Sequence, residues 1–277
     1  MNPSGVKMLK LTELRITALV KCATALFIVF IAFASLPTFA AAPNEDLDKI
    51  VKDLESPDPT VVLNATKLIK RNGTKAKEAV PLLVKALKHP NEIVRLNVME
   101  ALAEIGPDAA PAVPALTDAL KDKDYMTREA AALALFGIGK QSAPAVPNLI
   151  LCLGDDNKRV RDSAILALVK VEQPAVEHLI KAIQSGDSKT GQAASETLGR
   201  MGFYAVDPLI EVLKKGEKPA AERAAAALKE IGPNAVEQLV QVVLKGDDRS
   251  SRAAGNILAA IGSPAVPVLV EALRSKK

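Results

Sequence analysis

Residues 112–139 read AVPALTDALKDKDYMTREAAALALFGIG, and this stretch decides the fold. Apolar side chains recur at Val113 and three and seven residues later, which is the spacing of one face of an α-helix. Asp124 is a residue type that caps the start of a second helix, and Gly139 is one that ends it. The stretch therefore predicts two helices joined by a short turn.

The same pattern recurs along most of the chain. Units begin near residue 46 and at Ala79, Ala112, Ala145, Ala175, Ala205, Ala235 and Ala265. Successive Ala starts are 33 residues apart up to Ala145 and 30 residues apart after it. A helix pair of this length buries only one of its faces, so neighbouring pairs must stack. The sequence predicts an all-α fold, a right-handed α-solenoid of about seven helix pairs plus a final helix, over residues 43–277.

The ends of the second helices carry their own signals. Short polar residues precede them at Asn91, Asp124, Asn157, Asp187 and Asp247, and Glu217 takes this place once. Glycines follow most of them, and we expect these glycines to be left-handed. At Val171-Glu172-Gln173-Pro174 there is no glycine, and we expect Pro174 to end the helix. The spacing changes near residue 172, either as drift in loop length or as a change of superhelical curvature.

The units resemble the short HEAT-like repeat, of the kind also described in phycobilisome-lyase-type proteins. The pattern Ala-Val-Pro-x-Leu, then Asp-x-x-x-Arg, then Ala-Leu-x-x-Ile-Gly carries the resemblance over residues 46–277. It implies that a polar ladder ties adjacent repeats together, with its residues at Arg95, Arg128, Arg161, Arg252, Asp124 and Asp247. The pattern fails at Val62, Gln192 and Glu222, where the ladder is expected to be interrupted.

The N-terminus has the sequence of a secretory signal peptide. Four basic residues precede an apolar run from Cys22 to Leu36, and small residues at Thr38, Ala40 and Ala42 allow cleavage after Ala40 or Ala42. Residues 1–42 are therefore predicted to direct export to the periplasm or the outside of a bacterial cell. The alternative is an uncleaved N-terminal membrane anchor, although the run is short for a bilayer span.

Composition excludes several classes of function. Without residues 1–42 the chain has 32 basic and 31 acidic side chains, so its charge gives no reason to bind nucleic acid or anionic lipid. Trp is absent, and outside the N-terminal stretch the aromatic residues are Tyr125, Phe136, Phe203 and Tyr204. The two histidines lie in different units. Outside residues 1–42 the one cysteine is Cys152, which stands at a position of the repeat that is apolar in other units and is expected in the core. We expect no enzyme activity, no metal and no cofactor.

One departure from the repeat pattern suggests a binding surface. On the second helix, the face opposite the core carries polar or small residues in most units, but the third and fourth units place Leu133, Phe136, Leu166 and Val169 there. Either helix tilt buries these residues, or they form an exposed apolar stripe on a concave face, with Lys67, Lys70, Arg200 and Lys229 as a polar rim. The second reading predicts an exported scaffold that binds a protein or peptide. The alternative is a bilin lyase or chaperone, which the resemblance to phycobilisome-lyase-type proteins implies.

Overall fold

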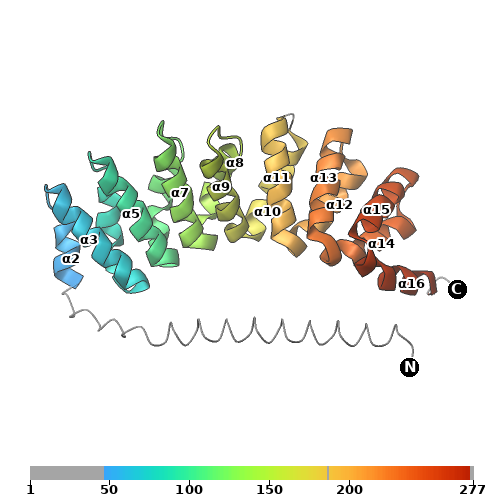
Figure 1. Ribbon diagram of the computed structural model, residues 1–277, viewed down its shortest axis with the longest axis horizontal. Coiled ribbons are helices and arrows are strands. Elements are labelled where there is room, and N and C mark those ends of the chain that lie inside the picture. The colour runs from blue at the N-terminus through green and yellow to red at the C-terminus, as the bar shows by residue number, and fades with distance from the viewer. Residues whose placement is uncertain (1–46, 186, 275–277) are drawn as a thin grey trace, which may run out of the picture. The chain divides into compact units, whose positions relative to one another are not determined.

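A computed structural model describes residues 47–185 and 187–274. Every regular element in this part of the chain is a helix, which confirms the all-α prediction. The predicted N-terminal signal segment, residues 1–42, lies outside the described residues. The helices of residues 48–277 follow one another in chain order as helix pairs (Figure 1).

The described residues hold seven helix pairs and a final helix, as the repeat predicts. The first helices of the pairs are α2 (Leu47–Asp53), α4 (Val80–Ala86), α6 (Val113–Ala119), α8 (Val146–Cys152), α10 (Gln173–Gln184), α12 (Val206–Lys215) and α14 (Val236–Lys245). The second helices are α3 (Pro59–Asn72), α5 (Glu92–Ile105), α7 (Tyr125–Ile138), α9 (Lys158–Val171), α11 (Ser188–Met201), α13 (Lys218–Ile231) and α15 (Asp248–Ile261), and the final helix is α16 (Val266–Arg274).

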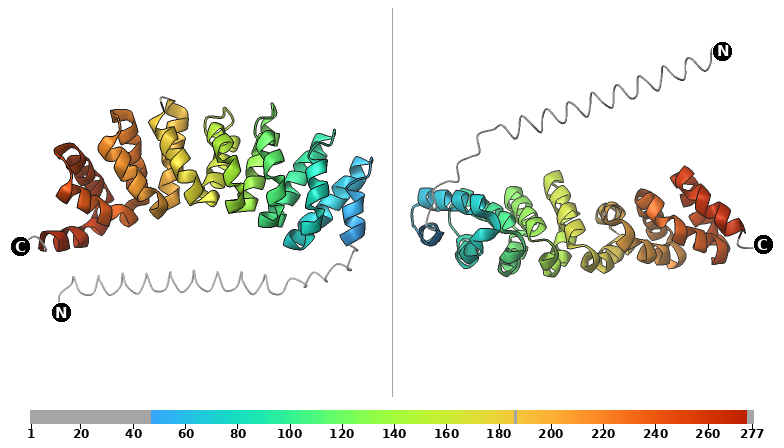
Figure 2. Two further views of the ribbon diagram at one scale, coloured as in Figure 1. Left: turned by 180° about the vertical axis from the view of Figure 1, so that it is seen from behind. Right: turned by 90° about the horizontal axis from the view of Figure 1, so that it is seen from below.

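The core lies between successive pairs, where each pair covers the apolar face of the next. Second helices of neighbouring units pack directly on one another, as α5 does on α7 and α7 on α9. In α5, for example, Val98 and Leu102 are buried in this core. Figure 2 shows the same succession of pairs from behind and from below. We name the surface that the second helices present away from this core the second-helix face.

Helices α5 and α7 approach each other closely at two small residues, Gly137 and Ala103. A Cβ placed on Gly137 of α7 would stand 2.4 Å from the carbonyl oxygen of Ala103 in α5. Real atoms do not come this close, so the contact of α5 and α7 depends on the absence of a side chain at residue 137.

The helix starts follow the predicted capping chemistry. The side chains of Asn91, Asp124, Asn157, Asp187 and Asp247 all accept hydrogen bonds from backbone N–H groups of the next turn. Glu217 makes no such bond at the start of α13. The five short polar residues are therefore caps, as their chemistry predicts.

The helix ends differ from the prediction in their backbone angles. The glycines after the second helices have φ between 53° and 78°, but their ψ lies between −128° and −137°. This region is not the left-handed helical one, and it is essentially open to glycine alone. Glu172 adopts the same conformation, with φ 64° and ψ −137°, and Pro174 lies inside the first turn of α10. Glu172 therefore takes the place of the glycine, and the expectation that Pro174 ends α9 is wrong.

The change from 33 to 30 residues has a simple structural origin. Every second helix has 14 residues, before and after the change. In the longer units a seven-residue 3₁₀ helix such as η2 (Gly106–Ala112) follows, whereas the shorter units have a four-residue one such as η5 (Gly232–Ala235). At the change itself, α9 and α11 pack less closely than α5 and α7. The hand and the curvature of the superhelix stay predictions.

Candidate protein-interaction surface on the second helices

The predicted apolar stripe is at the surface. Leu133 and Phe136 come from α7 and are 39% and 37% exposed, and Leu166 comes from α9 and is 41% exposed. Val169, one turn further along α9, is half-buried. Both helices turn their alanines, such as Ala134 and Ala167, toward the core. The alternative that helix tilt buries the stripe is therefore wrong for its three largest side chains.

The stripe borders a first hollow, of about 580 Å³, between α5 and α7. Its apolar lining includes Leu96, Met126, Leu133 and Phe136. We name it the α5–α7 hollow. Its charged rim holds two ion pairs between neighbouring second helices and, in addition, the acidic side chain of Glu104, so this rim has one more negative than positive charge. These pairs are Lys70 with Glu100, and Arg159 with Glu129 at 3.1 Å.

A second hollow, of about 330 Å³, lies where α9 and α11 pack less closely. Its lining is mostly apolar and includes Phe136, Leu166, Val169, Met201 and Tyr204. We name it the α9–α11 hollow. Because Phe136 lines both hollows, the apolar surface runs without a break from α5 to the segment after α11.

The charged rim of the α9–α11 hollow comes from three side chains. Arg200 is paired with Glu196 at 2.6 Å, and Glu172 is paired with Lys140 at 2.8 Å. The hydrogen bond from Lys140 lowers the pKa of the Glu172 carboxyl, so this group is an anion at neutral pH. Lys170 has no ion-pair partner in the part of the chain that the structure describes.

The predicted rim residues are not all at the stripe. Lys70 and Arg200 line its two hollows. Lys67 faces a separate hollow toward Glu104, and Lys229 lies at another one between α13 and α15. The rim of the stripe is therefore shorter than the sequence suggests.

Sequence reasoning missed part of the apolar lining, above all Tyr204 and Met126. Tyr204 is 47% exposed and belongs to η4 (Gly202–Ala205), in a connection rather than on a helix face. The sequence did carry one signal for Tyr204: it is one of only four aromatic residues in the repeats. Met126 stands two turns before Leu133 on α7 and is also exposed.

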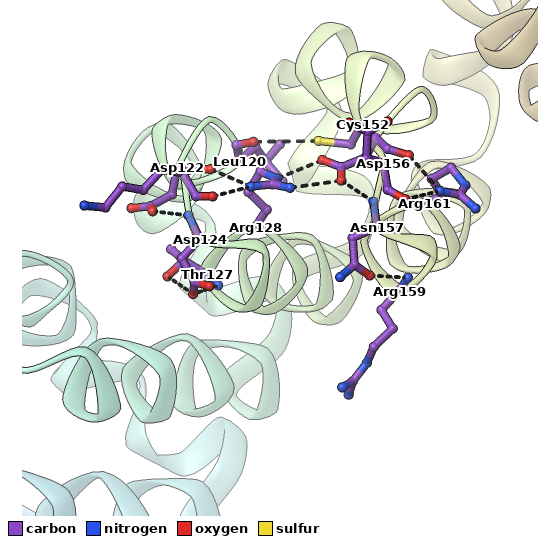
Figure 3. A network of polar contacts seen from close by, with 12 residues as sticks. Leu120, Asp122, Asp124, Thr127, Arg128, Cys152, Asp156, Asn157, Arg159 and Arg161 are labelled. Carbon is purple, nitrogen blue, oxygen red and sulfur yellow. Dashed lines mark hydrogen bonds and ion pairs between the residues drawn. The ribbon is translucent and has the colours of Figure 1, made fainter.

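The predicted ladder residues join two repeats at Arg128. Its Nε lies 2.7 Å and its Nη2 2.9 Å from the two carboxylate oxygens of Asp155, in the next unit. Its Nη1 donates to the carbonyls of Asp122 and Lys123 in its own turn (Figure 3). Arg128 therefore holds one turn together and clamps it to the following one.

At the other ladder positions, the hydrogen bonds stay within one unit. Arg95 and Arg161 donate from Nη1 to two carbonyls of their own turns, and Arg252 donates from Nε to Asp248 in its own helix. Opposite Arg161, Ser185 occupies the sequence position that Asp155 has opposite Arg128, so no carboxylate stands at that position. Asp124 and Asp247 act as helix caps.

The ladder is also continued where an interruption was expected. Arg223, one residue after Glu222, donates from Nη1 to the carbonyls of Ile183 and Ser185 in the preceding unit, at 2.9 Å each. Its guanidinium lies over Gly191, where a Cβ would come within 2.7 Å of it. A shift of one residue and a glycine opposite it thus restore a contact between repeats.

The described residues hold no group of three or more His, Cys, Asp or Glu side chains placed to bind a metal ion. Cys152 is buried, its Sγ lies 3.8 Å from the Leu120 carbonyl oxygen, and burial raises the pKa of its thiol to about 11. His89 accepts a hydrogen bond at Nδ1 from the Asn91 backbone N–H, in the turn before α5. The thiol of Cys152 thus packs in the core, and the imidazole of His89 is part of the turn before α5.

No single helix among the described residues is long and apolar enough to cross a membrane. One pair, residues 248–261 with 263–272, passes the same test of length and composition only when taken together, and it is bent by 117°.

The fold and the stacking of its units define a repeat protein of the α-solenoid class. The family model of HEAT repeats matches residues 47–136, 113–199 and 146–219, which together cover more than half of the chain. The chain therefore belongs to the HEAT repeat family. No curated protein matches it.

Several solved structures are similar to this chain. An engineered protein has 24% identity and a TM-score of 0.47, over 82% of this chain and 71% of that one. A computationally designed armadillo repeat protein for modular peptide recognition has 20% identity and a TM-score of 0.42, over 78% and 99%. The archaeal HEAT-like repeats protein from Thermococcus onnurineus NA1 has 16% identity and a TM-score of 0.45, over 79% and 98%.

Proposed function

We propose that this HEAT repeat protein is an exported, non-catalytic scaffold that binds a protein or peptide through its second-helix face. The observation that carries the proposal is the run of exposed apolar side chains on α7 and α9 between two hollows. Large apolar side chains that share one exposed patch mark interaction sites more often than scattered ones do. Binding there removes apolar surface from water, and that is the main driving force of association.

The test is capture of partners by the full chain, purified from cells that produce it. Replacing Leu133 and Phe136 by Asp places two charges in the apolar surface and should abolish capture while helical circular dichroism stays unchanged. The matched control is Leu151→Asp in α8, because Leu151 is 71% exposed but belongs to a first helix. Equal capture by the wild type and the Leu133/Phe136 variant would contradict the proposal.

Export is a separate part of the proposal, and residues 1–42 carry it. N-terminal sequencing of the protein recovered outside the cytoplasm should give a chain that begins after Ala40 or Ala42. A product that keeps its original N-terminus and stays with the membrane would support the anchor instead. The bilin lyase alternative stays a prediction, and absorbance after incubation with a bilin tests it.

A further inference from the structure

Lys170 is the unpaired cation beside the apolar stripe. Apart from Glu172, the other charged groups at the two hollows are the ion pairs Lys70–Glu100, Arg159–Glu129 and Arg200–Glu196, whose charges compensate each other, and Glu104, which makes the α5–α7 hollow acidic. Lys170 has no such partner in the described ranges 47–185 and 187–274. Glu172, the anion that lines the same hollow, is already paired with Lys140. The local sum of Lys140, Lys170 and Glu172 is therefore one positive charge.

The side chain of Lys170 is also positioned by its surroundings. Its Cγ and Cε lie 3.7 and 3.8 Å from the point where a Cβ on Gly139 would stand. The stem thus lies along the start of η3 (Gly139–Ala145), and Lys170 lines the α9–α11 hollow together with Phe136 and Val169. A cation held at the edge of an apolar hollow favours a ligand that has an apolar group and an anion next to each other.

The separation of the two hollows sets the length of a ligand that fills both. The α5–α7 hollow and the α9–α11 hollow are two second helices apart. Packed helices lie about 8–10 Å apart, so the distance is roughly 16–20 Å. An extended chain rises about 3.3 Å per residue and spans this distance in about six residues.

We propose that the second-helix face binds an extended peptide segment whose two large apolar side chains are about six residues apart, with an acidic residue beside the one in the α9–α11 hollow. The inference rests on the proposed function and adds the chemistry of the partner. The apolar side chains enter the two hollows on either side of Phe136, and the carboxylate meets Lys170. The positive charge at the α9–α11 hollow distinguishes this peptide from one with a basic residue at that place.

The experiment uses the full chain and synthetic, fluorescein-labelled serine peptides that carry two leucines about six residues apart. One peptide has a glutamate beside one of its two leucines, and the second has a lysine at the same place. Fluorescence polarisation at low salt should show tighter binding of the glutamate peptide, by about three- to tenfold, since an exposed charge pair is weak. The preference should shrink at high salt, which screens exposed charges.

The decisive variant is Lys170→Glu, which should reverse the preference to the lysine peptide. The matched control is Lys181→Glu in α10, an exposed lysine of a first helix, which should leave the preference unchanged. Failure of both peptides to bind, equal binding of the two, or an unchanged preference in Lys170→Glu would overturn the inference. Loss of native partners in the Leu133/Phe136 variant would then still support the proposed function, so the two failures are distinguishable.

Discussion

Arg128 and Asp155 join two consecutive repeats through a two-point contact between guanidinium and carboxylate. The distances are 2.7 Å from Nε and 2.9 Å from Nη2 to the two oxygens of the carboxylate. Both side chains are largely buried, at 18% and 11% exposure. A charged hydrogen bond shielded in this way contributes more than the exposed pairs of the same surface do.

Arg128→Ala should therefore lower the free energy of unfolding by about 2 kcal/mol, because Asp155 and two backbone carbonyls lose their partner. Urea denaturation followed by circular dichroism measures the change. The control is Lys158→Ala, which removes the exposed pair with Asp162 and should cost less than about 1 kcal/mol. Equal effects of the two substitutions would show that Arg128 is not a clamp between repeats.

The same contact makes stability depend on pH. Burial alone would raise the pKa of the Asp155 carboxyl, but the hydrogen bonds from Arg128 and from the Asn157 backbone lower it below its ordinary value. A lowered folded-state pKa gives stability that is present above the ordinary pKa, near 4, and is lost as the pH falls through the folded-state pKa. The difference in stability between wild type and Arg128→Ala should therefore shrink in strong acid.

The contact of α5 and α7 leads to a second prediction. Gly137→Ala should destabilise the protein by about 1–3 kcal/mol, because the added Cβ would meet the backbone of Ala103 and force the helices apart. Gly255→Ala in α15 is the control, since a Cβ there meets nothing within 4 Å. It should be neutral or stabilise by up to about 1 kcal/mol through its higher helix propensity. Thermal unfolding of both variants measures the contrast, and a stable Gly137→Ala would contradict the close packing.

Periodicity in the sequence predicts the helix pairs because each unit has apolar residues at the same positions and packs against its neighbours in the same way. Comparison of equivalent positions also found Leu133, Phe136, Leu166 and Val169, since the units other than the third and fourth have polar or small residues there. Tyr204 was missed because it reaches the α9–α11 hollow from a connection, and connections do not follow the helical period. The hollow itself depends on the looser packing of α9 and α11, a property of two helices together that neither helix shows in its own sequence.

The end of α9 at Glu172 was missed for a different reason. Sequence rules assign positive φ to glycine, so a glutamate in that place is not recognised as a helix end. A non-glycine residue at φ 64° and ψ −137° carries a strain of order 1–3 kcal/mol. The ion pair with Lys140 offsets only a small part of it, because Lys140 is exposed.

Glu172→Gly should therefore stabilise the protein, by about 1 kcal/mol, although it removes an ion pair. Thermal unfolding would show a higher midpoint than that of the wild type. The reciprocal control is Gly202→Glu, which places a side chain at φ 64° with no atom within 4 Å of its Cβ and should destabilise by a similar amount. A lower midpoint in Glu172→Gly would mean that the contacts of Glu172 with Lys140 and Tyr204 outweigh the strain of its backbone.

The thiol of Cys152 should react slowly in the folded protein. Burial raises its pKa to about 11, so almost none of it is the reactive thiolate at pH 8. Ellman's reagent at pH 8 should therefore label the folded protein, processed to contain Cys152 alone, far more slowly than a free thiol, and should label it at the ordinary rate in concentrated urea. Stabilising substitutions such as Glu172→Gly should slow the labelling further if it proceeds through unfolding. Rapid labelling of the folded chain would mean that the thiol is accessible and would contradict its place in the core between α8 and the preceding unit.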